Sequence, residues 1–153
     1  MLKNSLFYLL LIVQLISCDN NYRSGMVVSA KHEASKAGID ILKRGGNAFD
    51  AMIATDLALA VVYPNAGNLG GGGFMVYRLS DGKNGTLDYR EKAPINSKVD
   101  MYLDDNNQVI KGLSQNGALA IGVPGTIAGL FEIHDKFGSI PIKELFTEGC
   151  IAI

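Results

Sequence analysis

Four consecutive glycines, residues 70–73, and the pair Arg90 and Glu91 are the residues whose types and spacing could do chemistry. Consecutive glycines cost backbone entropy on folding, so a chain keeps them where side chains would obstruct a close approach to the backbone. A nearby arginine offers a planar cation that suits a carboxylate. These features together indicate a site for a small anionic ligand. They do not name a reaction, because no obvious nucleophile accompanies them.

The glycine run has two other interpretations. In a dinucleotide loop of the form G-x-G-x-x-G, the last glycine would fall on Met75 or Val76, and the run leads into a strand instead of a helix. This fit is poor. The structural alternative is that glycines let neighbouring backbones pack tightly, and the residues alone favour it.

Two helices are predicted before the glycine run. Residues 26–28 are expected to form a short buried strand, and Ser29 to cap the first helix, which Gly45 and Gly46 end. Asn47 is expected to cap a helix over 49–62 that is apolar on nearly all sides and therefore belongs in a core. The first helix places its apolar residues on one face: Ala34, Ala37, Gly38, Ile41 and Leu42.

The glycines lead into a predicted β-hairpin. Its strands are expected at 73–79 and 86–90, joined by the turn 81–85, and Pro94 ends the second strand because proline donates no ladder hydrogen bond.

The remaining third of the chain begins with a polar, turn-rich stretch over 95–116. Its tip, 104–107, is predicted to be a solvated turn, because the spacing and the terminal Glu of an EF-hand calcium loop are missing. A strand over 118–123, a helix over about 126–137 and a helix starting at Pro141 are expected to follow.

Four other ionisable residues are given structural interpretations. Asp50 is expected to interact with the dipole at the start of its helix. Asp56 is expected either at the solvent edge or hydrogen-bonded inside. His32 and His134 lie far apart without ligand spacing and are expected on helix surfaces.

Composition predicts one modest globular domain of 153 residues. A formal net charge of −1 argues against nucleic acid as a partner, because phosphate binding needs a surplus of positive charge. The two cysteines, Cys18 and Cys150, have no metal-binding spacing. Neither a metal site nor a cofactor is predicted.

Residues 1–17 are interpreted as a targeting segment. Lys3 precedes an apolar run over 6–16 that is short for a membrane span and suits a signal peptide. The run ends in Leu-Ile-Ser-Cys, which resembles a bacterial lipoprotein signal with Cys18 as the lipidated residue and 18–24 as a tether. The alternative is an ordinary secretory signal. The lipoprotein interpretation predicts an exported protein anchored to a membrane surface, in the bacterial periplasm or at the cell surface.

Residues 25 to about 144 resemble the N-terminal part of the large subunit in the gamma-glutamyltransferase (glutathione hydrolase) family. Several motifs in one order carry this resemblance, which makes it far more specific than any single motif. They are MVVS (26–29) before a helix, GGNAFDA (45–51), GNLGGGGFM (67–75), DYREKAP (88–94) and GVPGT (122–126).

The resemblance implies an α+β fold, the N-terminal portion of an αββα sandwich of the N-terminal-nucleophile hydrolase type. In that family a precursor cuts itself into two subunits. The new N-terminal Thr of the small subunit takes the γ-glutamyl group of glutathione and passes it to water or an amino acid, without a cofactor. Arg90 matches the arginine that binds the substrate's α-carboxylate. Glu91 is expected to orient Arg90 or to contact the substrate's ammonium group, with a structural ion pair as the alternative. The glycines are expected to form close-packed backbone near the pocket floor.

The chain departs from the family in length, and none of its threonines matches the nucleophile motif: Thr55, Thr86, Thr126 and Thr147. No catalytic residue is therefore predicted here. Residues 25–153 are expected to be a truncated, inactive piece that needs a C-terminal small-subunit partner, with its sheets incomplete and Phe74, Val76 and Leu87 exposed. The alternative is a non-catalytic membrane-anchored lipoprotein remnant.

Overall fold

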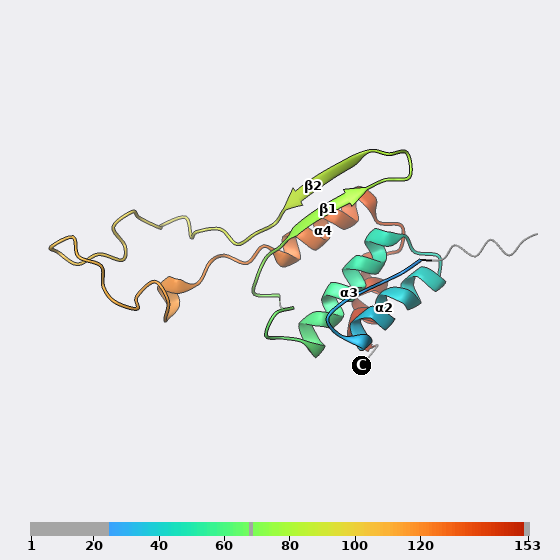
Figure 1. Cartoon of the computed structure of the whole chain (residues 1–153), viewed down its shortest axis with the longest axis horizontal. Helices are drawn as coiled ribbons and strands as arrows, with labels where there is room; N and C mark the ends of the chain where they lie inside the picture. Colours follow the sequence, from blue (N-terminus) through green and yellow to red (C-terminus); the bar gives the residue numbers. More distant parts are fainter. Residues whose placement is uncertain (1–24, 68, 152–153) are drawn as a thin grey trace, which may run out of the picture.

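The computed structural model describes residues 25–67 and 69–151. A group of helices and one β-hairpin form a body, from which the residues between the hairpin and the next helix extend as a long excursion (Figure 1). Within the body, the hairpin lies beside α4, and α3 lies between the hairpin and the rest of the helices. The elements in chain order are α2 (His32–Lys43), α3 (Ala48–Val62), β1 (Phe74–Arg78), β2 (Asn84–Asp88), the 3-10 helix η1 (Ala118–Ala120), α4 (Thr126–Phe137) and α5 (Ile142–Ile151).

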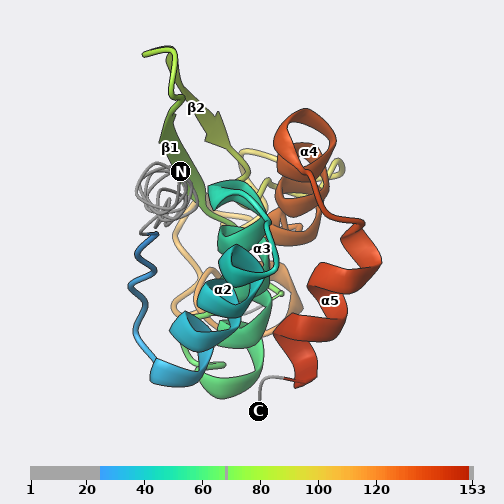
Figure 2. The ribbon, with the colours of Figure 1, turned by 90° about the vertical axis from the view of Figure 1, so that its right-hand side faces the viewer.

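Helix α3 is the centre of the body. It packs against α2, α4 and α5, and Figure 2 shows the three around it. The predicted apolar face of α2 is confirmed, since Ala34, Ala37, Gly38 and Ile41 are buried and Leu42 is half-buried. The core around α3 also takes Met75 from the hairpin, Leu130 and Ile133 from α4, and Leu145 from α5. An apolar helix with few charges is buried here as predicted.

The start of α3 is fixed by a reciprocal cap. The Asn47 side-chain oxygen accepts from the backbone N–H groups of Phe49 at 2.8 Å and Asp50 at 3.1 Å, and Asp50 accepts from Asn47 N at 2.9 Å. Asp50 is fully buried, and Ser139 N donates to its Oδ1 at 3.0 Å. The predicted first-turn position of Asp50 is confirmed. This carboxylate also ties α3 to the α4–α5 connection, which the sequence did not indicate.

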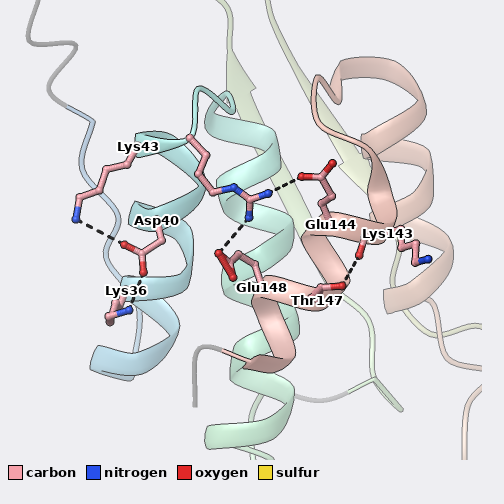
Figure 3. A network of polar contacts seen from close by, with 8 residues as sticks. Lys36, Asp40, Lys43, Lys143, Glu144, Thr147 and Glu148 are labelled. Carbon is pink, nitrogen blue, oxygen red and sulfur yellow. Dashed lines mark hydrogen bonds and ion pairs between the residues drawn. The ribbon is translucent and has the colours of Figure 1, made fainter.

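A group of surface ion pairs joins α2 to α5 (Figure 3). Arg44, which follows α2, bonds Glu148 Oε1 at 3.1 Å and also pairs with Glu144. On α2 itself, Lys36 and Lys43 both face Asp40, at 2.7 Å and 3.6 Å. These groups are partly exposed, so they add less to stability than the core does.

Two predictions near the start of the described chain are wrong. Residues 26–28 form no strand, and Met26 and Val28 are 87% and 82% exposed. A strand needs a neighbouring strand for its ladder, and none of the described strands pairs with these residues. Ser29 does not cap α2 either. Its hydroxyl donates to the carbonyl of Lys31 at 2.8 Å. The helix begins at His32, with Lys31 in the N-cap position.

The hairpin is confirmed, with β2 two residues earlier than predicted. Its register pairs Met75 with Leu87 and Val76 with Thr86, so alternate residues face the core or the outside. Val76 and Phe74 are exposed, as predicted. Leu87 is not, because it lies on the inner face and packs against the core.

The predicted strand over 118–123 is also wrong. Residues 118–120 form η1, whose backbone bonds are local, and only Val123 makes an isolated bridge, with Lys92. No described strand lies alongside to extend that bridge. Helix α4 spans the residues predicted for it, and α5 starts one residue after the predicted Pro141. The coarse prediction of an α+β fold is therefore confirmed. No helix of the described residues is both long and apolar enough to cross a membrane.

Candidate functional site

Residues 88–92 carry both candidate binding residues, and their backbone is hydrogen-bonded to Gly73 and to Val123. Tyr89 N donates to Gly73 O at 3.0 Å, which continues the hairpin pairing beyond β2. Arg90 N donates to Asp88 Oδ1 at 3.0 Å. Lys92 and Val123 exchange two backbone hydrogen bonds of 3.1 Å and 2.8 Å. Residues 89–92 lie beyond the end of β2, and these hydrogen bonds fix their path.

Glycines from two distant parts of the chain, Gly72 and Gly125, lie against this segment. A Cβ added at Gly72 would lie 2.7 Å from the backbone nitrogen of Glu91, and one added at Gly125 would collide with the carbonyl of Tyr89. Gly71 O accepts from Gly125 N at 2.8 Å, which joins the glycine run to the start of α4. Any side chain at these positions would displace the segment. The expected close packing is confirmed at Gly72 and Gly73, and its physical reason is the path of residues 89–91, whereas Gly70 is exposed.

Tyr89 points the other way, into the body. Its ring fills the space that a Cβ at Gly73 or Gly129 would occupy. Tyr89 and Asp56 both line a cavity of about 590 Å³ between residues 25–29, α3 and Phe74. Burial raises the pKa of the Asp56 carboxyl. Burial, with the nearby charge of Asp56, raises the pKa of the Tyr89 hydroxyl. Asp56 is half-buried at the wall of this cavity, so its solvent-edge alternative fits the structure better.

Arg90 lies on the outer face of the hairpin. Because Phe74 pairs with Asp88, these two residues and Arg90 share that face. The guanidinium carbon of Arg90 lies 5.9 Å from the centre of the Phe74 ring, a cation–π distance. No carboxylate within residues 25–67 and 69–151 lies within ion-pair distance of Arg90. The arginine is exposed, supported by an aromatic ring and open to an external anion.

Glu91 is exposed beside Arg90, and its Cβ packs near Gly122. Neighbouring residues of an extended segment point to opposite faces. The described part of the chain accordingly contains no ion pair between Glu91 and Arg90. Phe74 was not predicted as part of this site, although the hairpin register, read two residues past Asp88, is a signal that could have found it.

Other candidate positions are accounted for by local contacts. His134 Nε2 bonds the carbonyl of Ile140 at 2.7 Å, and His32 is exposed on α2. At the 104–107 turn, the Asp104 carboxylate accepts from the backbone of Asn106 at 2.9 Å. The described residues include no cluster of His, Cys, Asp or Glu that could hold a metal ion. Cys18, the predicted lipidation site, lies outside the described residues.

Comparison with known proteins decides the family. The model of the family described as Gamma-glutamyltranspeptidase matches residues 34–150. The chain belongs to this family.

Relatives and solved structures agree with the family assignment. The glutathione hydrolase proenzymes of Pseudomonas sp. (strain A14) and Escherichia coli (strain K12) are 53% and 46% identical over 124 and 123 residues, or 81% and 80% of this chain and 22% and 21% of theirs. The Helicobacter pylori gamma-glutamyltranspeptidase structure superposes with a TM-score of 0.80 at 45% identity, covering 85% of this chain and 37% of that one. The Pseudomonas nitroreducens enzyme complexed with L-DON gives 0.79 at 48%, covering 84% and 38%. The predicted family is confirmed, and this chain spans about a fifth of the length of the curated relatives it matches.

Proposed function

We propose that this chain is the N-terminal part of the large subunit of a glutathione hydrolase, a γ-glutamyltransferase that moves the γ-glutamyl group of glutathione or a related compound to water or an amino acid. The family membership supports the reaction class. The share of the relatives that the chain spans supports its being one part of a longer enzyme. In this proposal the helical body and hairpin are the first portion of an αββα sandwich, and a C-terminal part completes it.

In this proposal Arg90 binds the α-carboxylate of the γ-glutamyl group. The observation that carries it is the exposed guanidinium on a segment clamped by Gly72 and Gly125, with no carboxylate partner among the described residues. A fixed backbone lowers the entropy lost when the side chain orders around a ligand. A guanidinium also binds a carboxylate through two parallel hydrogen bonds, which selects this group by geometry as well as charge.

Glu91 is proposed to contact the α-ammonium group of the same substrate. Its exposed carboxylate follows Arg90 directly, and within the described ranges no cation forms an ion pair with it. Because the backbone directs Glu91 and Arg90 to opposite faces, this contact requires the Glu91 side chain to turn toward the Arg90 face when the substrate binds.

The nucleophile is proposed to be a Thr of the C-terminal part, so that the 153-residue chain alone is inactive. The threonines here occupy structural places. Thr55 is buried and donates to the carbonyl of Ala51 at 2.7 Å, and Thr147 donates to that of Lys143 at 2.9 Å. Thr126 is buried at the start of α4, and Thr86 lies within β2. The family's activated nucleophile is a hydroxyl beside its own free α-amine, which an internal threonine lacks.

The test uses two proteins, this chain alone and a continued protein. We define the continued protein as this chain followed by the part of the Escherichia coli glutathione hydrolase proenzyme that lies beyond its matching segment. Release of p-nitroaniline from γ-glutamyl-p-nitroanilide is expected from the continued protein only. Release by the chain alone, above a heat-treated control, would show that the nucleophile lies within these 153 residues. Its absence from a folded, self-cleaved continued protein would contradict the proposed reaction.

Arg90→Ala in the continued protein is expected to lower kcat/KM by about 10- to 100-fold, the range of one lost charge-assisted hydrogen-bonded contact. Arg90→Lys should recover part of this loss, because a lysine keeps the charge without the fork. The matched control is Arg78→Ala, which removes another exposed arginine from the same face of the hairpin. Equal kinetics for the Arg90 and Arg78 variants would reject the assignment.

The second candidate function is a membrane-anchored lipoprotein without catalysis, and the Leu-Ile-Ser-Cys motif ending at Cys18 favours an anchor in either case. We propose export and lipidation at Cys18, with residues 1–17 removed and 18–24 as a tether. Radiolabelled fatty acid should enter the wild type and Cys150→Ser, but not Cys18→Ser. Equal labelling of both variants would rule out this anchor. An anchored continued protein that releases no p-nitroaniline would favour the non-catalytic alternative.

A further inference from the structure

Residues 95–123, which we name the docking arm, extend away from the helical body (Figure 1). No residue of the docking arm belongs to either hydrophobic cluster of the described core. Large apolar side chains are nevertheless frequent along it. Those at least 40% exposed are Ile95, Val99, Val109, Ile110, Leu119, Ile121 and Val123, of which Ile95 and Val99 are fully exposed. Apolar surface gathered on one segment in this way is typical of an interaction site.

The bonds within the docking arm shape it without covering these residues. Leu103 and Val109 form an isolated antiparallel bridge, and the Tyr102 hydroxyl donates to the carbonyl of Leu119 at 2.8 Å. Most other backbone bonds of the arm join residues a few positions apart. The arm therefore has a defined local path, and the seven apolar residues named above stay at least 40% exposed within the described part of the chain.

The structural match to a longer relative reaches the arm. The Helicobacter pylori structure matches 85% of this chain, a larger share than the residues outside the docking arm make up, so the match continues into the arm. The helical body does not hold the arm in this conformation, because the arm extends away from the body (Figure 1). The matched relative contains much more polypeptide, since this chain covers 37% of it. The additional polypeptide is the part of the relative available to hold the arm in place.

We propose that the docking arm binds along the apolar surface of the C-terminal part that follows the matched segment in the relatives, and buries Ile95, Val99 and Val109 there. This inference rests on the proposed function only in that the chain is one part of a longer protein. The last residue of the arm, Val123, forms the bridge with Lys92, which is two residues from Arg90. Docking along the arm therefore brings the C-terminal part to the residue proposed to bind substrate.

The test is limited trypsin digestion, because two cleavable lysines lie in the docking arm, Lys98 and Lys111. In the 153-residue chain both sites are exposed and should be cut rapidly. In the continued protein both should be cut at least 10-fold more slowly, measured by mass spectrometry of the fragments. Equal cleavage rates in the two proteins would overturn the proposal. Protection already present in the chain alone, with a dimer in analytical ultracentrifugation, would also overturn it and identify a second copy as the occupant.

Val99→Asp in the continued protein should restore rapid cleavage at Lys98 and Lys111, because a charge cannot be buried against an apolar surface without cost. Asn106→Asp is the matched control, since it adds the same charge to an exposed position of the arm without removing an apolar side chain, and should leave both sites protected. If Val99→Asp reduces the yield of folded protein, hydrogen exchange of the arm's backbone amides can be compared between the 153-residue chain and the continued protein, both without the substitution. Protection with no p-nitroaniline release would reject the proposed function and leave this inference standing.

Discussion

The helical body and the docking arm use apolar residues in opposite ways. In the body, Ile41, Leu130, Ile133 and Leu145 are completely buried around α3. In the docking arm, Ile95 and Val99 are completely exposed. Both regions lie in one chain and meet at the segment that carries Arg90. The contrast indicates that the body can be stabilised by its own contacts, whereas the apolar side chains of the arm contribute only once something covers them.

The largest expected effect comes from truncating one apolar residue in each region, which tests whether apolar side chains stabilise the body but not the docking arm. Leu130→Ala in the 153-residue chain should lower the free energy of unfolding by about 2–5 kcal/mol, because it leaves a cavity in the core. Val99→Ala in the same chain should change it by less than about 0.5 kcal/mol, since no packing is lost at an exposed site. Urea unfolding followed by circular dichroism measures both.

A loss of more than about 1 kcal/mol for Val99→Ala would mean that the docking arm packs within the chain alone. The same substitution in the continued protein is expected to be more destabilising than in the chain alone. That difference would separate an arm that is covered by the C-terminal part from one that remains in solvent.

A second comparison concerns carboxylates, one inside the body and one at the tip of the arm. Asp50→Asn removes a buried acceptor from the α3 cap and from Ser139 and should cost about 1–3 kcal/mol near pH 7. Asp105→Asn, at the exposed tip of the docking arm, should leave stability unchanged. Thermal or urea unfolding of the two variants beside the wild type measures the contrast.

The effect of Asp50 should also depend on pH. Burial by itself would raise the pKa of Asp50, but hydrogen bonds from Ser139, Asn47 and Ile140 outweigh burial and hold the pKa below its ordinary value. A carboxyl with a lowered pKa in the folded state stabilises above its unfolded pKa, about 3.9. This contribution is lost as the pH falls through the lower folded value. The wild-type advantage over Asp50→Asn should therefore be constant between about pH 6 and 7 and shrink below about pH 4. A constant difference down to acidic pH would contradict this account.

The sequence predicted those elements whose determinants are local. Asn47 caps α3 as its type indicates, Asp50 lies in the first turn, and the apolar face of α2 follows from helical spacing. The strands expected at 26–28 and 118–123 failed because a strand also requires a partner, and hydrophobic spacing does not identify one. The location of the Arg90 segment could be predicted from its motif. The clamp on that segment could not, because Gly72 and Gly125 are distant in sequence and meet only in the folded chain.

The smallest effect is expected where the body is tied together at its surface. Arg44→Ala removes the ion pairs to Glu144 and Glu148, whose side chains are 48% and 26% exposed. Solvent weakens such pairs, so the variant should lose no more than about 1 kcal/mol, and the loss should shrink as salt is raised from 0.05 to about 1 M. Lys83→Ala, which removes the exposed pair with Asp81 in the hairpin turn, is the control for a pair that joins no two helices. A salt-independent loss of several kcal/mol would show that Arg44 stabilises the α2–α5 contact through packing instead of charge. The surface contact and the buried core would then be stabilised by the same kind of interaction and would differ only in its size.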